Sequence, residues 1–252
     1  MTAPSPPPPA WRRIGLVGGI GWPSTLRYYE LLNRRVGERL GGLASADLAL
    51  RSLDFARVFA AADTPGRVER MLVQAAQDLH AAGARVLGVC SHTGHLFCGP
   101  LRAAPPMPFV AIDTALAQHL RAQGVSQAWL LGVRRTLVHP LLHEALRAAG
   151  IRTRIPAEAT LQALDEAIFT ELERGEVGPR TLAVLDAIEH ELRAQGAEHV
   201  VLACTELQPA VAQRPLPFRL WDTVPIHCDA LLAAAWGDAG AHAEGLPCST
   251  PT

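Results

Sequence analysis

Two cysteines end short apolar segments in the stretches VLGVCSHT (residues 86–93) and VLACTELQ (residues 201–208). Cys90 and Cys204 each follow a strand-like run and directly precede Ser or Thr residues typical of a helix start. A thiolate can remove a proton from carbon and a neutral thiol can return one, so two facing thiols could invert a stereocentre. A helix N-terminus lowers a thiol pKa, and its free N–H groups bind carboxylates. The pair therefore predicts proton transfer on a small acid.

Other chemistries for these residues are weaker. A single cysteine at a strand end is usually inert packing, so the argument depends on there being two of them. The spacing Cys90-x-His92-x-x-His95-x-x-Cys98 contains the residue types of a zinc site. A helix that begins near Ser91 would not make these four side chains converge, so we expect no metal and no cofactor.

The elements around the two cysteines occur twice, which predicts an internal duplication. Three pairs of residues share an offset of 114: Val17 with Leu131, Pro65 with Pro179, and Cys90 with Cys204. Each proline sits where a long helix should begin, and each helix leads into a cysteine-ended strand. A repeated βα pattern without common descent is the alternative explanation.

Short strands alternate with helical patterns along the chain, which predicts an α/β fold with parallel sheets. We expect two pseudo-symmetric Rossmann-like halves at 13–113 and 114–219, with a helix at about 220–236 joining the first half. Residues 1–12 read as a disordered proline-rich tail and residues 237–252 as a loose tail. Because ligands bind at the carboxyl ends of parallel strands, the active site should lie in the cleft between the halves.

The composition excludes several functional classes. The chain has no lysine, so its 23 basic residues are all arginine, which rules out a pyridoxal Schiff base and a P-loop. A net charge of −1 gives no basic surface for nucleic acid, and no apolar run approaches the ~20 residues of a membrane span. Five cysteines and no recognisable signal peptide favour the cytoplasm.

Several of these segments together resemble the aspartate/glutamate racemase family, within the Asp/Glu/hydantoin racemase superfamily. The similarity runs from about Arg13 to Trp236, and its carriers are IGLVGGIGWPSTLRYYELLN, RSLDF, VLGVCSHTGH, LLGVRRT, VVLACTE and LWDTVPIH. The resemblance implies cofactor-independent racemases with two α/β halves, a site between them and one catalytic cysteine from each half. It also implies a homodimer.

Carried over by position, the resemblance makes Cys90 and Cys204 the two catalytic bases. The substrate-binding residues that we predict are Gly19, Ile20, Ser91, His92, Thr93, Thr136, Thr205 and Glu206, together with Arg51. Arg51 is included because it lies at a plausible strand end, where an arginine fork could hold a second carboxylate. The chain departs from the family at Ile20, where Met is usual, and at Val133, where Thr is usual. The largest departure is His92, which stands where an Asn that grips the amino-acid head group is usual. An imidazole is bulkier than the amide of Asn and can be charged, so the substrate could differ from that of other family members.

The function we predict is racemisation of aspartate or glutamate by two cysteines. Two alternatives use the same scaffold: maleate cis–trans isomerisation and decarboxylation of a malonate-type acid, both favoured by His92. A third is a non-catalytic module that binds a small acid. Alkylation of the thiols should leave the affinity of such a binder intact, whereas it should abolish turnover by any of the enzymes.

Overall fold

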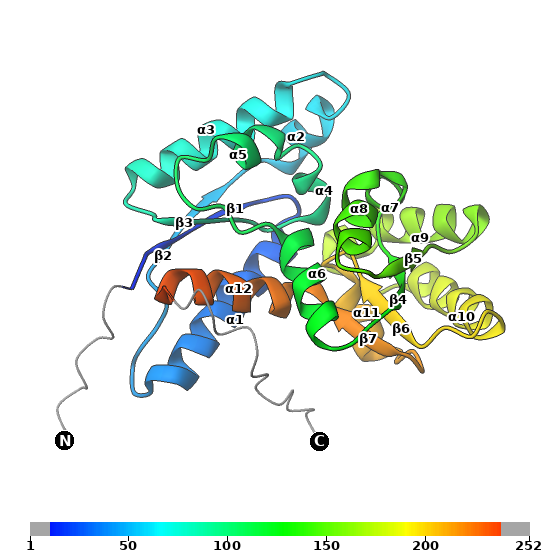
Figure 1. The fold of residues 1–252 in the computed structure, drawn as a ribbon. Coiled ribbons are helices and arrows are strands. Elements are labelled where there is room, and N and C mark those ends of the chain that lie inside the picture. The colour runs from blue at the N-terminus through cyan, green and yellow to red at the C-terminus, as the bar shows by residue number, and fades with distance from the viewer. Residues whose placement is uncertain (1–10, 238–252) are drawn as a thin grey trace.

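A computed structural model describes residues 11–237, so most of both predicted tails lies outside the described residues. The chain forms two α/β halves, as Figure 1 shows. The elements of the first half are β1 (Ile14–Gly18), α1 (Trp22–Leu40), β2 (Leu48–Ser52), α2 (Phe55–Ala61), α3 (Arg67–Ala81), β3 (Val86–Val89), α4 (His92–His95) and α5 (Gly99–Ala103).

The second half begins with α6 (Ile112–Ala122) and repeats the pattern. Its further elements are β4 (Gln127–Leu131), α7 (Arg134–Val138), α8 (Pro140–Ala148), β5 (Arg152–Arg154), α9 (Glu158–Thr170), the 3₁₀ turn η1 (Leu172–Arg174), α10 (Pro179–Ala194), β6 (His199–Leu202), α11 (Leu207–Gln213) and β7 (Arg219–Asp222). The final helix is α12 (Thr223–Trp236).

Both sheets are parallel throughout, with strand orders β2-β1-β3 and β5-β4-β6-β7. The first three strands of each order correspond, and β7 extends the second sheet. This arrangement confirms the predicted fold class. Parallel sheets are covered on both faces, which explains why β1 and β3 are apolar along their whole length.

Alternate residues of each strand enter different core layers, as the pleat requires. One face of the first sheet packs against α2, α3 and α5, and the other packs against α1 and α12. In the second sheet, α9, α10 and α11 cover one face, and α6 and α8 cover the other. Helix α12 contacts α1 and β3 of the first half and also α6. The last helix of the chain thus covers one face of the first sheet and also joins it to the second half.

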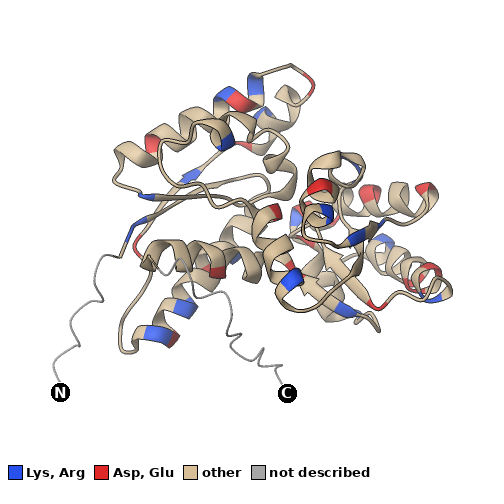
Figure 2. Ribbon diagram, viewed as in Figure 1, with Lys and Arg blue, Asp and Glu red and all other residues tan. Residues whose placement is uncertain are grey.

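Charged residues are interspersed over the helices of both halves, in agreement with a net charge of −1 (Figure 2). Within residues 11–237, no helix combines the length and the hydropathy that crossing a membrane requires.

Candidate active site

A cavity of about 240 Å³ lies between the two halves, at the carboxyl ends of their strands. From the first half, Ile20 and the segment Ser91–Gly94 line it just after β1 and β3. From the second half, Val133 and the segment Ala203–Glu206 line it just after β4 and β6. Parallel α/β sheets bind ligands at this edge, so the position agrees with the predicted cleft.

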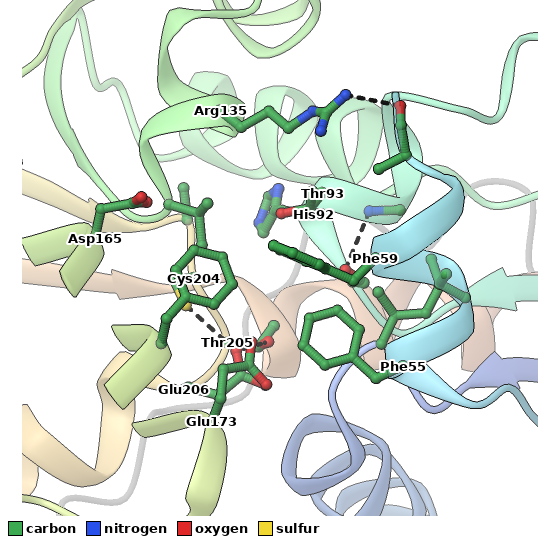
Figure 3. A pocket seen from close by; sticks show the side chains of 18 of the residues that line it. Phe55, Phe59, His92, Thr93, Arg135, Asp165, Glu173, Cys204, Thr205 and Glu206 are labelled. Carbon is green, nitrogen blue, oxygen red and sulfur yellow. Dashed lines mark hydrogen bonds between the residues drawn. The ribbon is translucent and has the colours of Figure 1, made fainter. Parts of the chain in front are cut away.

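Cys204 lines the cavity as part of a hydrogen-bonded cluster with its own loop. Its Sγ donates to Oε2 of Glu206 at 3.3 Å, and the Thr205 hydroxyl donates to the same oxygen at 2.8 Å. The hydroxyl of Ser24, on α1 of the first half, contacts both Thr205 and the other carboxylate oxygen of Glu206. The cluster therefore orients the thiol, and Figure 3 shows Cys204 beside Thr205 and Glu206. Through Ser24 it also connects the two halves of the chain.

Burial, and then the nearby Glu206 carboxylate, raise the pKa of the Cys204 thiol well above its ordinary value. Glu173, from η1, lies beside this cluster (Figure 3). Burial and then the charge of Glu206 raise the pKa of Glu173 to about 8. At pH 7 the cavity thus holds a protonated thiol and a protonated carboxyl next to Glu206.

The loop after β3 is held by His95, whose two ring nitrogens both form hydrogen bonds with backbone groups. Its Nε2 accepts from the N–H of Ile112 at 3.1 Å, so Nδ1 carries the proton and donates to the Ser91 carbonyl at 2.6 Å. The Ser91 hydroxyl caps the following turn by accepting from the Gly94 N–H at 3.1 Å. His95 has no ring nitrogen free for a metal, and no group of three or more potential ligands occurs in the described part of the chain.

Two predicted binding residues join the halves behind this loop. The hydroxyls of Thr93 and Thr136 lie 2.8 Å apart, and Thr93 lines the cavity. Gly19 shapes the neighbouring turn, because its φ of 85° is a left-handed conformation and a side chain there would meet the Leu53 backbone. Its N–H donates to the Thr25 hydroxyl at 2.8 Å.

Cys90, in contrast, does not line the cavity. Its side chain is 1% exposed and lies in the apolar cluster between β3, α1 and α12, beside Tyr28, Val224 and Cys228. Burial, followed by the nearby Cys228, raises the pKa of the Cys90 thiol well above its usual value. The structure thus brings Cys204 and not Cys90 to the cavity, whereas the sequence predicted that both thiols face it.

Strand pairing gives the reason why the two cysteines lie in different environments. Val17 of β1 pairs with Val89 of β3, and its counterpart Leu131 of β4 pairs with Leu202 of β6. The strand end at Val89 therefore corresponds to Leu202, an offset of 113 rather than 114. Two residues after each strand stand Ser91 and Cys204. A slip of one residue reverses the face of a strand, so Ser91 occupies the place that the sequence comparison assigned to Cys90.

The other predicted residues also fall into those that line the cavity and those that do not. Ile20, His92, Thr205 and Glu206 line the cavity together with Ser91 and Thr93. Arg51 does not, since it is half exposed on β2 and pairs with Asp78 of α3 at 3.4 Å. The arginine at the cavity is Arg135, which donates to the carbonyl of Ala62 at 2.9 Å and pairs with Asp63.

Several residues of the site were not predicted at all. One is Ser24, which supports the cluster around Glu206 without lining the cavity. The others line the cavity: Phe55, Val58, Phe59, Ala62, Phe97, Asp165, Phe169 and Glu173. Phe55 belongs to the RSLDF segment that carried the resemblance, so its place there was a signal. The segment ELERGE around Glu173 has no spacing or motif that marks a site.

Comparison with known proteins agrees with this architecture. The Asp/Glu/hydantoin racemase family model matches residues 17–231. A candidate Asp/Glu racemase from Yersinia pestis is 31% identical, with 89% of this chain and 99% of that chain covered and a TM-score of 0.78. An aspartate racemase homologue from Pyrococcus horikoshii OT3 is 27% identical over 89% of this chain and 99% of that chain, with a TM-score of 0.75.

A glutamate racemase from Aquifex pyrophilus shares the fold, with 18% identity, 87% of this chain and 82% of that chain covered, and a TM-score of 0.60. The resemblance that the sequence motifs predicted is thereby confirmed. With two parallel-sheet halves, a cavity at their shared strand ends and a family match over most of its length, the chain belongs to the Asp/Glu/hydantoin racemase family.

Proposed function

We propose that the chain is a cofactor-independent racemase that moves a proton at the α-carbon of an amino acid through Cys204. The observation that carries this proposal is the contact between the Cys204 thiol and Glu206 in the cavity, at 3.3 Å. Glu206 accepts the thiol proton, and the resulting thiolate removes the α-proton of the substrate. The carbanion is then protonated from the opposite face.

Ser91 is the counterpart of Cys204 in the other half of the chain, and both line the cavity. Its hydroxyl is therefore the group that would protonate the carbanion from the face opposite the thiol. A hydroxyl is a far weaker base than a thiolate at neutral pH, whereas it can still pass on a proton from water. The two directions of racemisation therefore begin with bases of different strength, and one enantiomer should lose its α-proton faster than the other. The hydroxyls of Thr93 and Thr205 and the imidazole of His92 are the groups that would hold the carboxylate.

The test is an inversion assay on both enantiomers of aspartate, glutamate, leucine and phenylalanine, followed by chiral chromatography. We expect inversion of at least one of these amino acids and unequal initial rates for its two enantiomers. A protein that binds a small acid without turning it over would give no inversion, and alkylation of its thiols would leave the affinity unchanged. That result would contradict the proposal. The predicted homodimer belongs to the same proposal, and sedimentation equilibrium tests it.

One observation also favours a second candidate, decarboxylation of a malonate-type acid. Loss of CO₂ leaves a carbanion that needs a single proton donor, and among the described residues Cys204 is the only cysteine that lines the cavity. Its raised pKa keeps that thiol protonated, as a donor requires. Release of CO₂ from phenylmalonate, without inversion of any amino acid, would favour the decarboxylase over the racemase.

A further inference from the structure

The cavity has a wall of aromatic rings. Four of the six phenylalanines in the chain line it: Phe55, Phe59, Phe97 and Phe169. Phe59 stands edge-on to Phe55 and to Phe169, with ring centroids 6.1 Å and 5.8 Å apart, so the wall extends from α2 of the first half to α9 of the second. Figure 3 shows Phe55 and Phe59 on one side of the cavity and Cys204 on the other.

The size of the cavity suits a ring. A cavity of roughly 150 Å³ is enough to hold benzene. The cavity here has a volume of about 240 Å³, which leaves space for a ring together with the carbon that bears the carboxylate.

The charged groups at this cavity already have partners in the protein. Arg135 donates to the Ala62 carbonyl and pairs with Asp63, while Asp165 accepts from the N–H of Arg134 at 2.8 Å. Glu206 accepts from Cys204, Thr205 and Ser24. Among the lining residues the structure describes, Arg135 is the one cation, against three carboxyl groups. A second carboxylate on a substrate would therefore meet one cation, whose charge is already shared with Asp63.

The polar atoms that lack partners belong to neutral groups. Nε2 of His92 and Oε2 of Glu173 are buried without a hydrogen-bond partner among the described residues. His92 is 5% exposed, and burial followed by the proximity of His95 lowers its pKa to about 3, so the imidazole is neutral. Glu173 is protonated at neutral pH for the reasons given above. Buried polar atoms without partners are costly, and the polar end of a ligand would satisfy them.

We infer that the substrate carries an aromatic or large branched aliphatic side chain and no second charge, so that phenylalanine-like acids fit this site and aspartate and glutamate do not. The apolar part lies against the phenylalanine wall, while the carboxylate end lies toward His92 and Cys204. This inference rests on the proposed function for the reaction, but the fit of the side chain is measurable without turnover.

The first arm of the test measures binding by calorimetry. The ligands are 3-phenylpropanoate, which is phenylalanine without its amino group, and glutarate, the corresponding analogue of glutamate. We expect the wild-type protein to bind 3-phenylpropanoate more tightly than glutarate. Phe59→Ala should weaken the binding of 3-phenylpropanoate about five- to tenfold through loss of a ring contact. Phe59 is 62% exposed, so this variant should fold; Leu26→Ala, at another exposed apolar residue outside the cavity, is the matched control.

The second arm follows α-proton exchange of phenylalanine, leucine, aspartate and glutamate by NMR in deuterated buffer. Faster exchange of glutamate or aspartate than of phenylalanine, with loss of that exchange in Arg135→Gln, would overturn the inference and leave the proposed function intact. Binding of 3-phenylpropanoate without exchange of any amino acid would support the inference and refute the proposed reaction. Tighter binding of glutarate than of 3-phenylpropanoate would overturn the inference directly.

Discussion

Glu173 allows the electrostatics of the cavity to be tested through protein stability. Its carboxyl group is buried at one side of the cavity beside Glu206, with Oε2 unpartnered among the described residues. Its pKa is raised from 4.5 to about 8, first by burial and then by the charge of Glu206. Replacement by glutamine keeps the shape of the side chain and mimics its protonated form. The variant Glu173→Gln should therefore remove one specific dependence of stability on pH.

The sign follows from proton linkage. Between the two pKa values the folded protein holds a proton on Glu173 that the unfolded chain has released, so the free energy of unfolding falls as pH rises. This contribution is complete below about pH 4.5 and is lost as pH rises through about 8. A shift of this size corresponds to about 5 kcal/mol at most. Because Glu173 is only partly buried and solvent screens its charge, we expect about 2 to 3 kcal/mol.

The assay is urea unfolding at pH 5, 7 and 9 for the wild type and Glu173→Gln. The variant should match the wild type at pH 5 within ~1 kcal/mol and exceed it by about 2 to 3 kcal/mol at pH 9. Glu176→Gln, at an exposed position in the same segment, is the control and should change little at either pH. If the free energies of unfolding of the wild type and Glu173→Gln differed by the same amount at all three pH values, the reasoning about this carboxyl group would be refuted.

Three further predictions concern the groups at the strand ends. Cys90→Ala should lower the free energy of unfolding by about 1 to 2 kcal/mol in a urea titration, because it removes a buried sulfur from the core. The rate of α-proton exchange of the substrate by Cys90→Ala should stay within about threefold of the wild-type rate. Complete inactivation of a stably folded Cys90→Ala protein would contradict this. The rate at which iodoacetamide alkylates Cys204, followed by mass spectrometry, should increase continuously up to at least pH 9. The reason is that only the thiolate reacts and the pKa of this thiol is raised well above its ordinary value. An alkylation rate that levels off below pH 8 would contradict this. Ser91→Cys should make the exchange rates of the two enantiomers more nearly equal, as it supplies a thiol on the second face, and an unchanged ratio would argue against the assigned role of Ser91.

Much of the fold could be predicted from the sequence because its elements repeat with simple signals. The apolar strands, the prolines at Pro65 and Pro179, and the glycines that follow the helices mark two βα arrays of similar length. Both prolines lie at or just before the start of a long helix, α3 and α10. Strand order and the layers that cover each sheet then follow from the general behaviour of parallel sheets.

The predicted arrangement of two facing thiols differs from the structure by one residue of strand register. Cys90 and Cys204 both stand just after apolar runs, and a sequence offset cannot tell which residue of a run is the last to pair. Strand pairing decides it, because Val89 and Leu202 are the corresponding strand ends. Since the pleat alternates, a difference of one residue sends the Cys90 side chain into the core and leaves Ser91 at the cavity.

The remainder of the site depends on contacts between distant segments. Phe59 and Phe169 are 110 positions apart in sequence and meet only because the fold brings α2 of the first half and α9 of the second to the same cavity. Ser24 reaches Glu206 from α1 in the same manner. Arg51 illustrates the converse, since its place after an apolar run suggested a ligand, yet Asp78 of the adjacent helix pairs with it.

The most direct test of the account is α-proton exchange, measured by proton NMR in deuterated buffer for the wild type, Cys204→Ala and Cys90→Ala. Each protein is incubated with the amino acid that the wild type inverts fastest. Cys204→Ala should lose exchange by a factor of about 10² to 10⁴, the usual contribution of an acid–base group, while Cys90→Ala should retain it. Exchange that survives in Cys204→Ala and disappears in Cys90→Ala would contradict the central claim that Cys204 moves the proton.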